Sequence, residues 1–337
     1  MEKNEETRRR RREADRLSRL PNDVLCRILS FLTTKQTVRT SVLSKRWTNL
    51  WLSVPDIEIN DIFIWSIKLN NRFNNFLNSI LIARDDAGTP FNRLSLDVGY
   101  GSPHLAFKIG FPKVLKSINF VLKRELKYLR LNLNLDDFDD CDNEYDVNER
   151  FLFKLPKTIL NCKTLVGLDL SHFTFPIYSF SSDEFGFPSL KTLKLSDVNF
   201  DGNFALFLSG CPILEDLTMF QVWYARNNYT QFKSLSLSKL IKADIDDCSC
   251  DSFALHALSA AESLCLDTFK MHAQEREFYE EIKGKVRFIM IMIHAKLIHT
   301  SCRYQTLDTN HMIIFNNLSF IVLLLVSTYL CRVGCAS

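Results

Sequence analysis

A pair of leucines separated by one residue recurs along this chain, and it constrains the fold more than any other feature. Such pairs stand at Leu168-x-Leu170 and Leu193-x-Leu195, and Leu217-x-Met219 is a third copy. The copies begin 25 and 24 residues apart. Alternating apolar residues predict short strands that bury one face. The nearly constant period predicts that these strands belong to a structural repeat.

Further segments extend the pattern over residues 91–269. Leu94–Leu96 and Leu129–Leu133 are short alternating strands, and Phe232–Leu237 and Ser263–Leu266 are weaker copies. No single unit can cover its own apolar edge, so neighbouring units must stack. The period falls within the roughly 20–29 residues that are typical of leucine-rich repeats. We therefore predict an α/β fold in which an irregular leucine-rich-repeat solenoid occupies residues 91–269.

The cysteines and the net charge narrow the class of protein. The chain has ten irregularly spaced cysteines, no secretory signal before them, and a formal net charge of only +3. We interpret the cysteines as reduced thiols of a nuclear or cytoplasmic protein. Cys162 and Cys211 occupy matching places before their strands, which predicts that both pack in the core. The small net charge gives no argument for nucleic-acid binding.

Residues 15–54 form a second region, in which apolar residues recur at helical spacing. Pro21 fits the start of a first helix, where proline loses no intrahelical donor. Thr33 and Gln36 have capping-box spacing for a second helix, and Ser44 can cap a third. The apolar positions are Val24, Leu25, Ile28, Leu29, Leu32, Val38, Val42, Trp47, Leu50, Trp51 and Val54. Three helices within about forty residues bury too little surface to be stable alone, so this unit must rest on the remaining chain, on a partner or on both.

These residues closely resemble an F-box. The resemblance is carried by Leu20-Pro21, by the helix Val24–Leu32 and by the run Val42-Leu-Ser-Lys-Arg-Trp47. The wider run Arg39–Trp47, followed by Leu50-Trp51, looks like the version found in plant F-box/leucine-rich-repeat proteins of the FBD type. Thr33 departs from the family, in which many members carry proline.

The resemblance implies a non-catalytic receptor subunit of a Skp–cullin–F-box ubiquitin ligase, whose repeats bind a protein target. It implies no cofactor, metal or nucleic acid. The residues expected to face the Skp-type adaptor are Leu20, Pro21, Leu25, Ile28, Leu29, Val42, Leu43 and Trp47. The other interpretation of the same side chains is that they close the helical core. A further alternative for the whole chain is a non-ligase interaction protein, either membrane-tethered or a truncated product.

The remaining segments carry weaker signals. Residues 1–14 contain the run Arg8, Arg9, Arg10, Arg11 and Arg12, which indicates either a solvated disordered leader or a nuclear-localisation signal. Residues 55–90 predict a strand or turn and then a helix, connecting the F-box to the repeats. Residues 270–317 are interpreted as a degenerate repeat region in which Val286–Ile293 is a candidate strand.

Eight acidic residues crowd the stretch 136–149, between the second and third predicted strands. A solvated insertion is the default interpretation, and a contact for a basic partner is the alternative. A calcium loop beginning at Asp140 fits poorly, because Tyr145 stands where glycine is required and Phe151 where a bidentate glutamate is required. The lone pair Cys248-x-Cys250 is a weak metal signal. No nucleophile elbow, phosphate loop or zinc motif occurs in the sequence, which favours a protein without an enzyme active site.

The end of the chain departs from the repeat pattern. Residues 318–337 begin with an apolar run of 14 residues up to Cys331. We interpret this segment as a truncated or altered ending of the gene model, since relatives usually continue with more repeats and an FBD region. A tail anchor competes with this interpretation, but spanning a bilayer takes about 20 residues. An ordinary buried strand is the third alternative.

Overall fold

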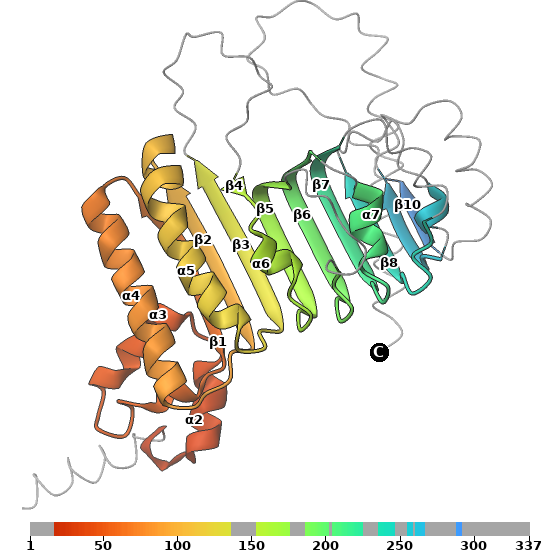
Figure 1. The fold of residues 1–337 in the computed structure, drawn as a ribbon. Coiled ribbons are helices and arrows are strands. Elements are labelled where there is room, and N and C mark those ends of the chain that lie inside the picture. Colours follow the sequence, from red (N-terminus) through yellow and green to blue (C-terminus); the bar gives the residue numbers. More distant parts are fainter. Residues whose placement is uncertain are drawn as a thin grey trace, which may run out of the picture. The chain divides into compact units, whose positions relative to one another are not determined.

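The computed structural model describes residues 17–135, 153–175, 186–201, 204–224, 235–246, 255–258, 260–266 and 288–291. All of them lie in the first of two compact units, Met1–Ile293. Their central element is a ten-stranded sheet in which every strand pair is parallel (Figure 1). The strands are β1 (Asp56–Ile64), β2 (Arg93–Tyr100), β3 (Tyr128–Leu135), β4 (Phe153–Lys154), β5 (Gly167–Phe175), β6 (Thr192–Phe200), β7 (Asp216–Tyr224), β8 (Lys242–Asp246), β9 (Ser263–Leu266) and β10 (Phe288–Ile291).

The strands follow one another across the sheet in chain order, except that the short strand β4 pairs beside β5. Parallel neighbours need a return segment between them. The α-helices are α2 (Asn22–Leu29), α3 (Thr34–Arg39), α4 (Ile67–Asp86), α5 (Phe111–Leu122), α6 (Lys157–Leu160) and α7 (Phe204–Ser209). Shorter turns of helix are η1 (Leu17–Arg19), η2 (Thr40–Val42), η3 (Leu50–Ser53), the π-helical η4 (His104–Gly110) and η6 (Leu255–Leu258). Helices α4 to α7 lie on the same face of the sheet (Figure 1).

The predicted leucine pairs lie in exact lateral register, which confirms the repeat. Leu168 is paired with Leu193, and Leu193 with Leu217. The second leucine of each pair forms a parallel row from Leu170 through Leu195 to Met219. All of these side chains are buried. One apolar row therefore stacks on the next, as the period requires.

Hydrogen bonds before each strand repeat with the same regularity. The carbonyl of Val166 accepts from the N–H groups of Lys191 and Thr192, at 2.8 and 3.1 Å. The carbonyl of Lys191 accepts in the same way from the next two amides along the sheet, those of Glu215 and Asp216. The repeat thus has a backbone signature beside its side-chain pattern.

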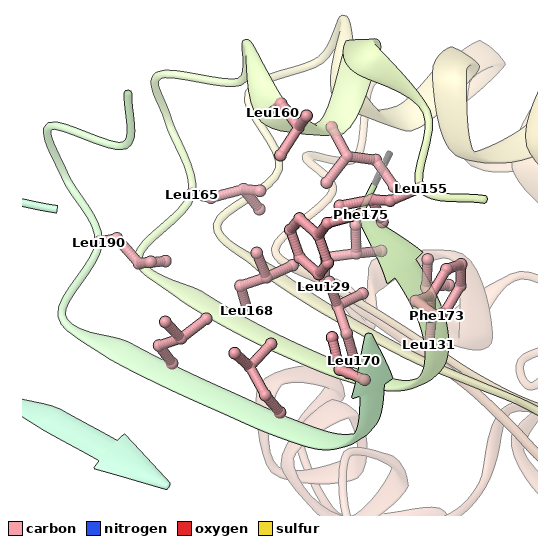
Figure 2. Packing of buried hydrophobic residues seen from close by; sticks show 14 of the residues in the cluster. Leu129, Leu131, Leu155, Leu160, Leu165, Leu168, Leu170, Phe173, Phe175 and Leu190 are labelled. Carbon is pink, nitrogen blue, oxygen red and sulfur yellow. The ribbon is translucent and has the colours of Figure 1, made fainter. Parts of the chain in front are cut away.

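The core lies between the sheet and its return segments. Figure 2 shows Leu168 and Leu170 of β5 in the same cluster as Leu155 and Leu160 of the preceding return segment. Phenylalanines fill this layer beyond the leucines, and the rings of Phe175 and Phe200 stack with centroids 4.1 Å apart. This packing accounts for many of the 27 phenylalanines in the chain.

The sheet begins earlier than the sequence pattern indicated. Strand β1 pairs with β2 and belongs to the same sheet, although it falls in the stretch interpreted as a connector. Ile57 and Ile59 of this strand are buried, and together with buried Val54 just before it they have the spacing of the later repeats. The leucine pattern did not reveal this first unit, because isoleucine and valine stand where the later units carry leucine. Helix α4 follows as predicted.

The prediction of a strand at Phe232–Leu237 was wrong. Among its described residues, Leu235 and Leu237 are buried but lie before the strand, and β8 is formed by Lys242–Asp246. Ala243 and Ile245 replace the leucine pair there, so the L-x-L pattern could not reveal it. Strands were found as predicted at Ser263–Leu266 and within Val286–Ile293, where β10 pairs with β9.

Candidate functional site

Helix α2 divides its apolar residues between two adjacent stripes. Leu25 and Leu29 are buried. Val24 and Ile28, one position earlier in each turn, are exposed. The exposed stripe continues at i+7 with Phe31, whose side chain is 76% accessible. The single apolar face predicted from the sequence is therefore half core and half solvent-facing surface.

A second exposed apolar pair follows the next helix. Thr33 caps helix α3 through the predicted capping box with Gln36. The chain then passes through η2 and presents Val42 and Leu43, which are 85% and 63% exposed. Clustered apolar exposure of this kind marks protein-interaction sites.

Arg46 ties the two exposed segments together. Its Nε and Nη2 atoms donate to Oδ1 of Asn22, at 2.9 and 2.7 Å, and Nη2 also donates to the carbonyl of Leu20. Asn22 begins helix α2, and Arg46 stands three residues after Leu43. These bonds fix the segment carrying Val42 and Leu43 against the start of the helix that carries Val24 and Ile28.

The predicted adaptor-facing residues thus separate into two groups. Pro21, Ile28, Val42 and Leu43 are exposed. Leu25, Leu29 and Trp47 are buried together with Leu50 and Val54, and Leu20 packs against this small core. The structure assigns Leu25, Leu29 and Trp47 to the core, where they support the surface. Direct contact with an adaptor stays a prediction for the exposed group.

The third α-helix predicted after Ser44 was wrong. Residues 45–49 form turns, and only Leu50–Ser53 continue, as the 3₁₀ segment η3. Pro55 restricts the preceding residue to extended backbone, which Val54 adopts. The apolar residues also serve two cores, since Trp51 packs against the sheet's core and Trp47 against the smaller one. A single regular helix would present these residues on one face and could not place them in both cores.

The N-terminal helical unit (residues 17–54) rests on the sheet, as its small size required. Val38 and Trp51 pack against the core of the repeats. Thr34 is buried, and its Oγ1 accepts a hydrogen bond from the N–H of Glu58 in β1 at 2.7 Å. These contacts hold the unit while leaving its exposed apolar residues uncovered among the described residues.

The face of the sheet opposite the helices is a second candidate surface. Its side chains alternate with the buried leucines and are mostly polar. Arg130 and Asp169, on neighbouring strands, form an ion pair at 3.5 Å, and Lys194 follows on the next strand. Burial raises the pKa of Asp169, while Arg130 and Lys194 oppose that rise. The strand register therefore holds charged side chains at regular positions across this face.

Sequence reasoning missed several residues of both surfaces. Val24 and Leu32 were assigned to a single helix face, Phe31 was not considered, and all three are exposed. The i, i+4, i+7 spacing of Val24, Ile28 and Phe31 was the available signal. On the sheet, the residues between the paired leucines gave the signal, because alternation places them on the outer face.

Comparison with known families agrees with this geometry. Residues 17–58 match the F-box domain. Residues 132–288 match the family described as the LRR repeats of FBD-associated F-box protein At5g56370. The chain is a plant F-box/leucine-rich-repeat protein.

Three curated relatives of this F-box protein come from Arabidopsis thaliana. It is 35% identical to the F-box/FBD/LRR-repeat protein At1g78750 over 70% of its own length and 48% of the relative. It is 37% identical to the F-box protein At1g60400 over 61% and 46% of the two chains. For the F-box/LRR-repeat protein At4g14103 the identity is 32%, over 62% and 51%. The F-box protein spans about half the length of these relatives.

F-box domains generally bind Skp-type adaptors, and F-box/leucine-rich-repeat proteins are typically non-catalytic. In the described part of this F-box protein, no three His, Cys, Asp or Glu residues are grouped to hold a metal ion. None of its described helices is long and apolar enough to cross a bilayer. The arginine run, the acidic stretch, the Cys248-x-Cys250 pair and the segment 318–337 lie outside the described residues.

Proposed function

We propose that this F-box protein is the substrate-recruiting subunit of a Skp–cullin–F-box ubiquitin ligase. The exposed apolar residues of the N-terminal helical unit dock the Skp-type adaptor, and the repeats hold a protein target. Ubiquitin transfer takes place on other subunits, so this chain contributes proximity and orientation.

The observation that carries the proposal is the concentration of exposed large apolar side chains in residues 17–43. Seven of the 13 such side chains in the described structure fall in this short stretch. They are Leu17, Val24, Ile28, Phe31, Leu32, Val42 and Leu43. Leaving them in water is unfavourable, and burial in a partner recovers about 25 cal/mol per Å² of apolar area.

The test is capture of the full-length protein by a purified Skp-type adaptor. The double variant Ile28→Ser/Phe31→Ser removes exposed apolar area without touching the core, so we expect at least a tenfold loss of affinity. The matched control is Ile67→Ser/Ile82→Ser on helix α4, where both residues are also exposed. Equal capture of both double variants and the wild type would contradict the proposal.

The proposed location is the nucleus, the cytoplasm or both, with the arginine run Arg8–Arg12 as an import signal. It is supported by sequence alone, because short arginine-rich runs serve as import addresses. A fluorescent fusion of the full chain, with and without alanine at these five positions, tests it. Unchanged nuclear signal in the variant would remove this role from the run.

A further inference from the structure

The N-terminal helical unit carries an excess of positive charge. Residues 17–54 contain six lysine or arginine residues and a single carboxylate, that of Asp23, which gives a net charge of +5. The whole chain has a net charge of only +3, so the remaining residues together carry −2. Positive charge is therefore concentrated in the unit that also holds more than half of the exposed large apolar side chains of the described structure.

Four of these cations have exposed side chains and no carboxylate partner in the described structure, and we call them the cationic rim: Arg27, Lys35, Arg39 and Lys45. Asp23 stands four residues before Arg27 on α2, but no ion pair joins the two in this part of the chain. In the repeats, by contrast, cations pair with carboxylates, as Lys191 does with Glu215 at 2.7 Å. Pairing the rim with carboxylates of another protein would break no ion pair within this chain.

The cationic rim borders the exposed apolar side chains. The guanidinium carbon of Arg27 lies 5.4 Å from the centroid of the Phe31 ring, which places this cation beside the exposed stripe of α2. The helical backbone of α3 continues through η2. Arg39 therefore lies beside Val42, three residues further on, and Lys35 lies one turn before Arg39. An apolar centre with a charged border is the usual anatomy of a protein–protein interface.

Two short helices present this surface, rather than one long amphipathic helix. Helix α2 has eight residues and α3 has six. The bonds from Arg46 to Asn22, at 2.9 and 2.7 Å, hold the segments after them together. The surface thus has a defined shape, which suits a folded protein with a complementary surface better than a fluid lipid surface.

We propose that the cationic rim steers association with the Skp-type adaptor, and that the adaptor presents carboxylates around the apolar surface that it contacts. The proposal rests on the proposed function and adds the chemistry of the partner's surface. Charges at the rim of an interface mainly raise the association rate, whereas most other interface contacts act on the dissociation rate. The rim therefore acts on the approach of the adaptor, and Ile28 and Phe31 act on the complex once it has formed.

Stopped-flow mixing of the full chain with a purified Skp-type adaptor measures the association rate. Between about 10 mM and about 150 mM ionic strength the Debye length falls from about 30 Å to about 8 Å. We expect the wild-type association rate to fall about tenfold over this range, because electrostatic steering is screened. The dissociation rate, measured by displacement, should change less than about twofold.

Variants locate the steering on the rim. Lys35→Gln/Arg39→Gln removes two rim charges, and we expect the association rate at low salt to fall about fivefold while the dissociation rate stays within about twofold. The matched control is Arg72→Gln/Lys116→Gln, which removes one arginine and one lysine from exposed positions of α4 and α5 and should leave the rate nearly unchanged. Residues 1–14 are the same in every protein compared, so their arginine run does not contribute to the difference.

The outcomes separate this inference from the proposed function. A salt-independent association rate, or equal rates for the rim variant and its control, overturns the inference although the complex still forms. Absence of any complex refutes both.

An anionic lipid surface is the other occupant that apolar residues with a cationic border could bind. Sedimentation with vesicles containing phosphatidylserine tests it. If Lys35→Gln/Arg39→Gln abolishes vesicle binding but leaves association with the adaptor at the wild-type rate, the assignment of the rim to the adaptor fails. Wild-type vesicle binding that is absent, together with slower adaptor association of the variant, supports the assignment.

Discussion

Thr34 in helix α3 accepts a hydrogen bond at 2.7 Å from the backbone N–H of Glu58, in the outermost strand of the sheet. The outer edge of a terminal strand carries backbone donors that have no neighbouring strand to pair with. Thr34 satisfies one of them with a buried side chain. The N-terminal helical unit therefore also covers the edge of the first strand, and a specific bond joins the two.

Replacing Thr34 by valine should destabilise the protein by about 1–3 kcal/mol. The change preserves the volume of the side chain but leaves the partly buried Glu58 N–H without its acceptor, which costs desolvation energy. Thr34→Ser retains the oxygen and should cost less. Chemical denaturation of the full chain with its adaptor measures both. A valine variant as stable as the wild type would show that this bond does not couple the two regions.

Trp47 and Val42 should respond in opposite ways to truncation. Trp47 is 7% exposed and belongs to the small core of the N-terminal unit, so Trp47→Ala should cost about 3–5 kcal/mol of stability. Val42 is 85% exposed, so Val42→Ala should leave stability within about 0.5 kcal/mol and weaken adaptor binding instead. Thermal melts and adaptor affinity, measured in parallel, separate the two effects. Loss of affinity without loss of stability in Trp47→Ala would place that ring at the interface.

Substitutions at two neighbouring residues of strand β6 should differ as strongly in their effect on stability. Leu195 is fully buried in the leucine rows, and Leu195→Ala should cost about 2–5 kcal/mol. Lys194 points to the other face and is exposed, so Lys194→Ala should change stability by less than about 0.5 kcal/mol. Denaturant midpoints of the two variants provide the measurement. Similar midpoints would contradict the alternation on which the assignment of both faces depends.

The repeat could be predicted from the sequence because alternating leucines are a local pattern, and the stacking of units requires that pattern at each strand. The leucine pattern did not reveal the strands in which other apolar residues take the same positions, namely Ile57 and Ile59 in β1 and Ala243 and Ile245 in β8. Alanine and isoleucine fit those positions in the packed core, but they carry no leucine signature. Only the pairing register shows that these residues continue the apolar rows.

The candidate surfaces were predictable only in part, for a different physical reason. Helical spacing identifies apolar residues on α2, but it does not say which of two adjacent stripes faces the core. The presence of Trp47 and Leu50 opposite Leu25 and Leu29 decides this, and it is a tertiary contact. The ion pair between Arg130 and Asp169 was equally hidden, because the two residues are 39 positions apart and meet only through strand register.

Cys265 should be a slow nucleophile although it is only partly buried. Burial is the main cause that raises the pKa of its thiol to about 11, and Asp244 adds to that rise by charge and by hydrogen bonding. The thiolate is the reactive form, so alkylation at pH 8 should be slow and should accelerate about tenfold per pH unit towards that pKa. Asp244→Asn lowers the pKa and should increase the rate at pH 8. Lys242 stabilises the thiolate, so Lys242→Met should decrease the rate.

Iodoacetamide labelling read out by peptide mass spectrometry gives the rate at this site, and partly buried Cys26 is the internal reference because both changes lie outside its surroundings. Equal rates in the wild type and Asp244→Asn would show that this carboxylate does not govern the thiol.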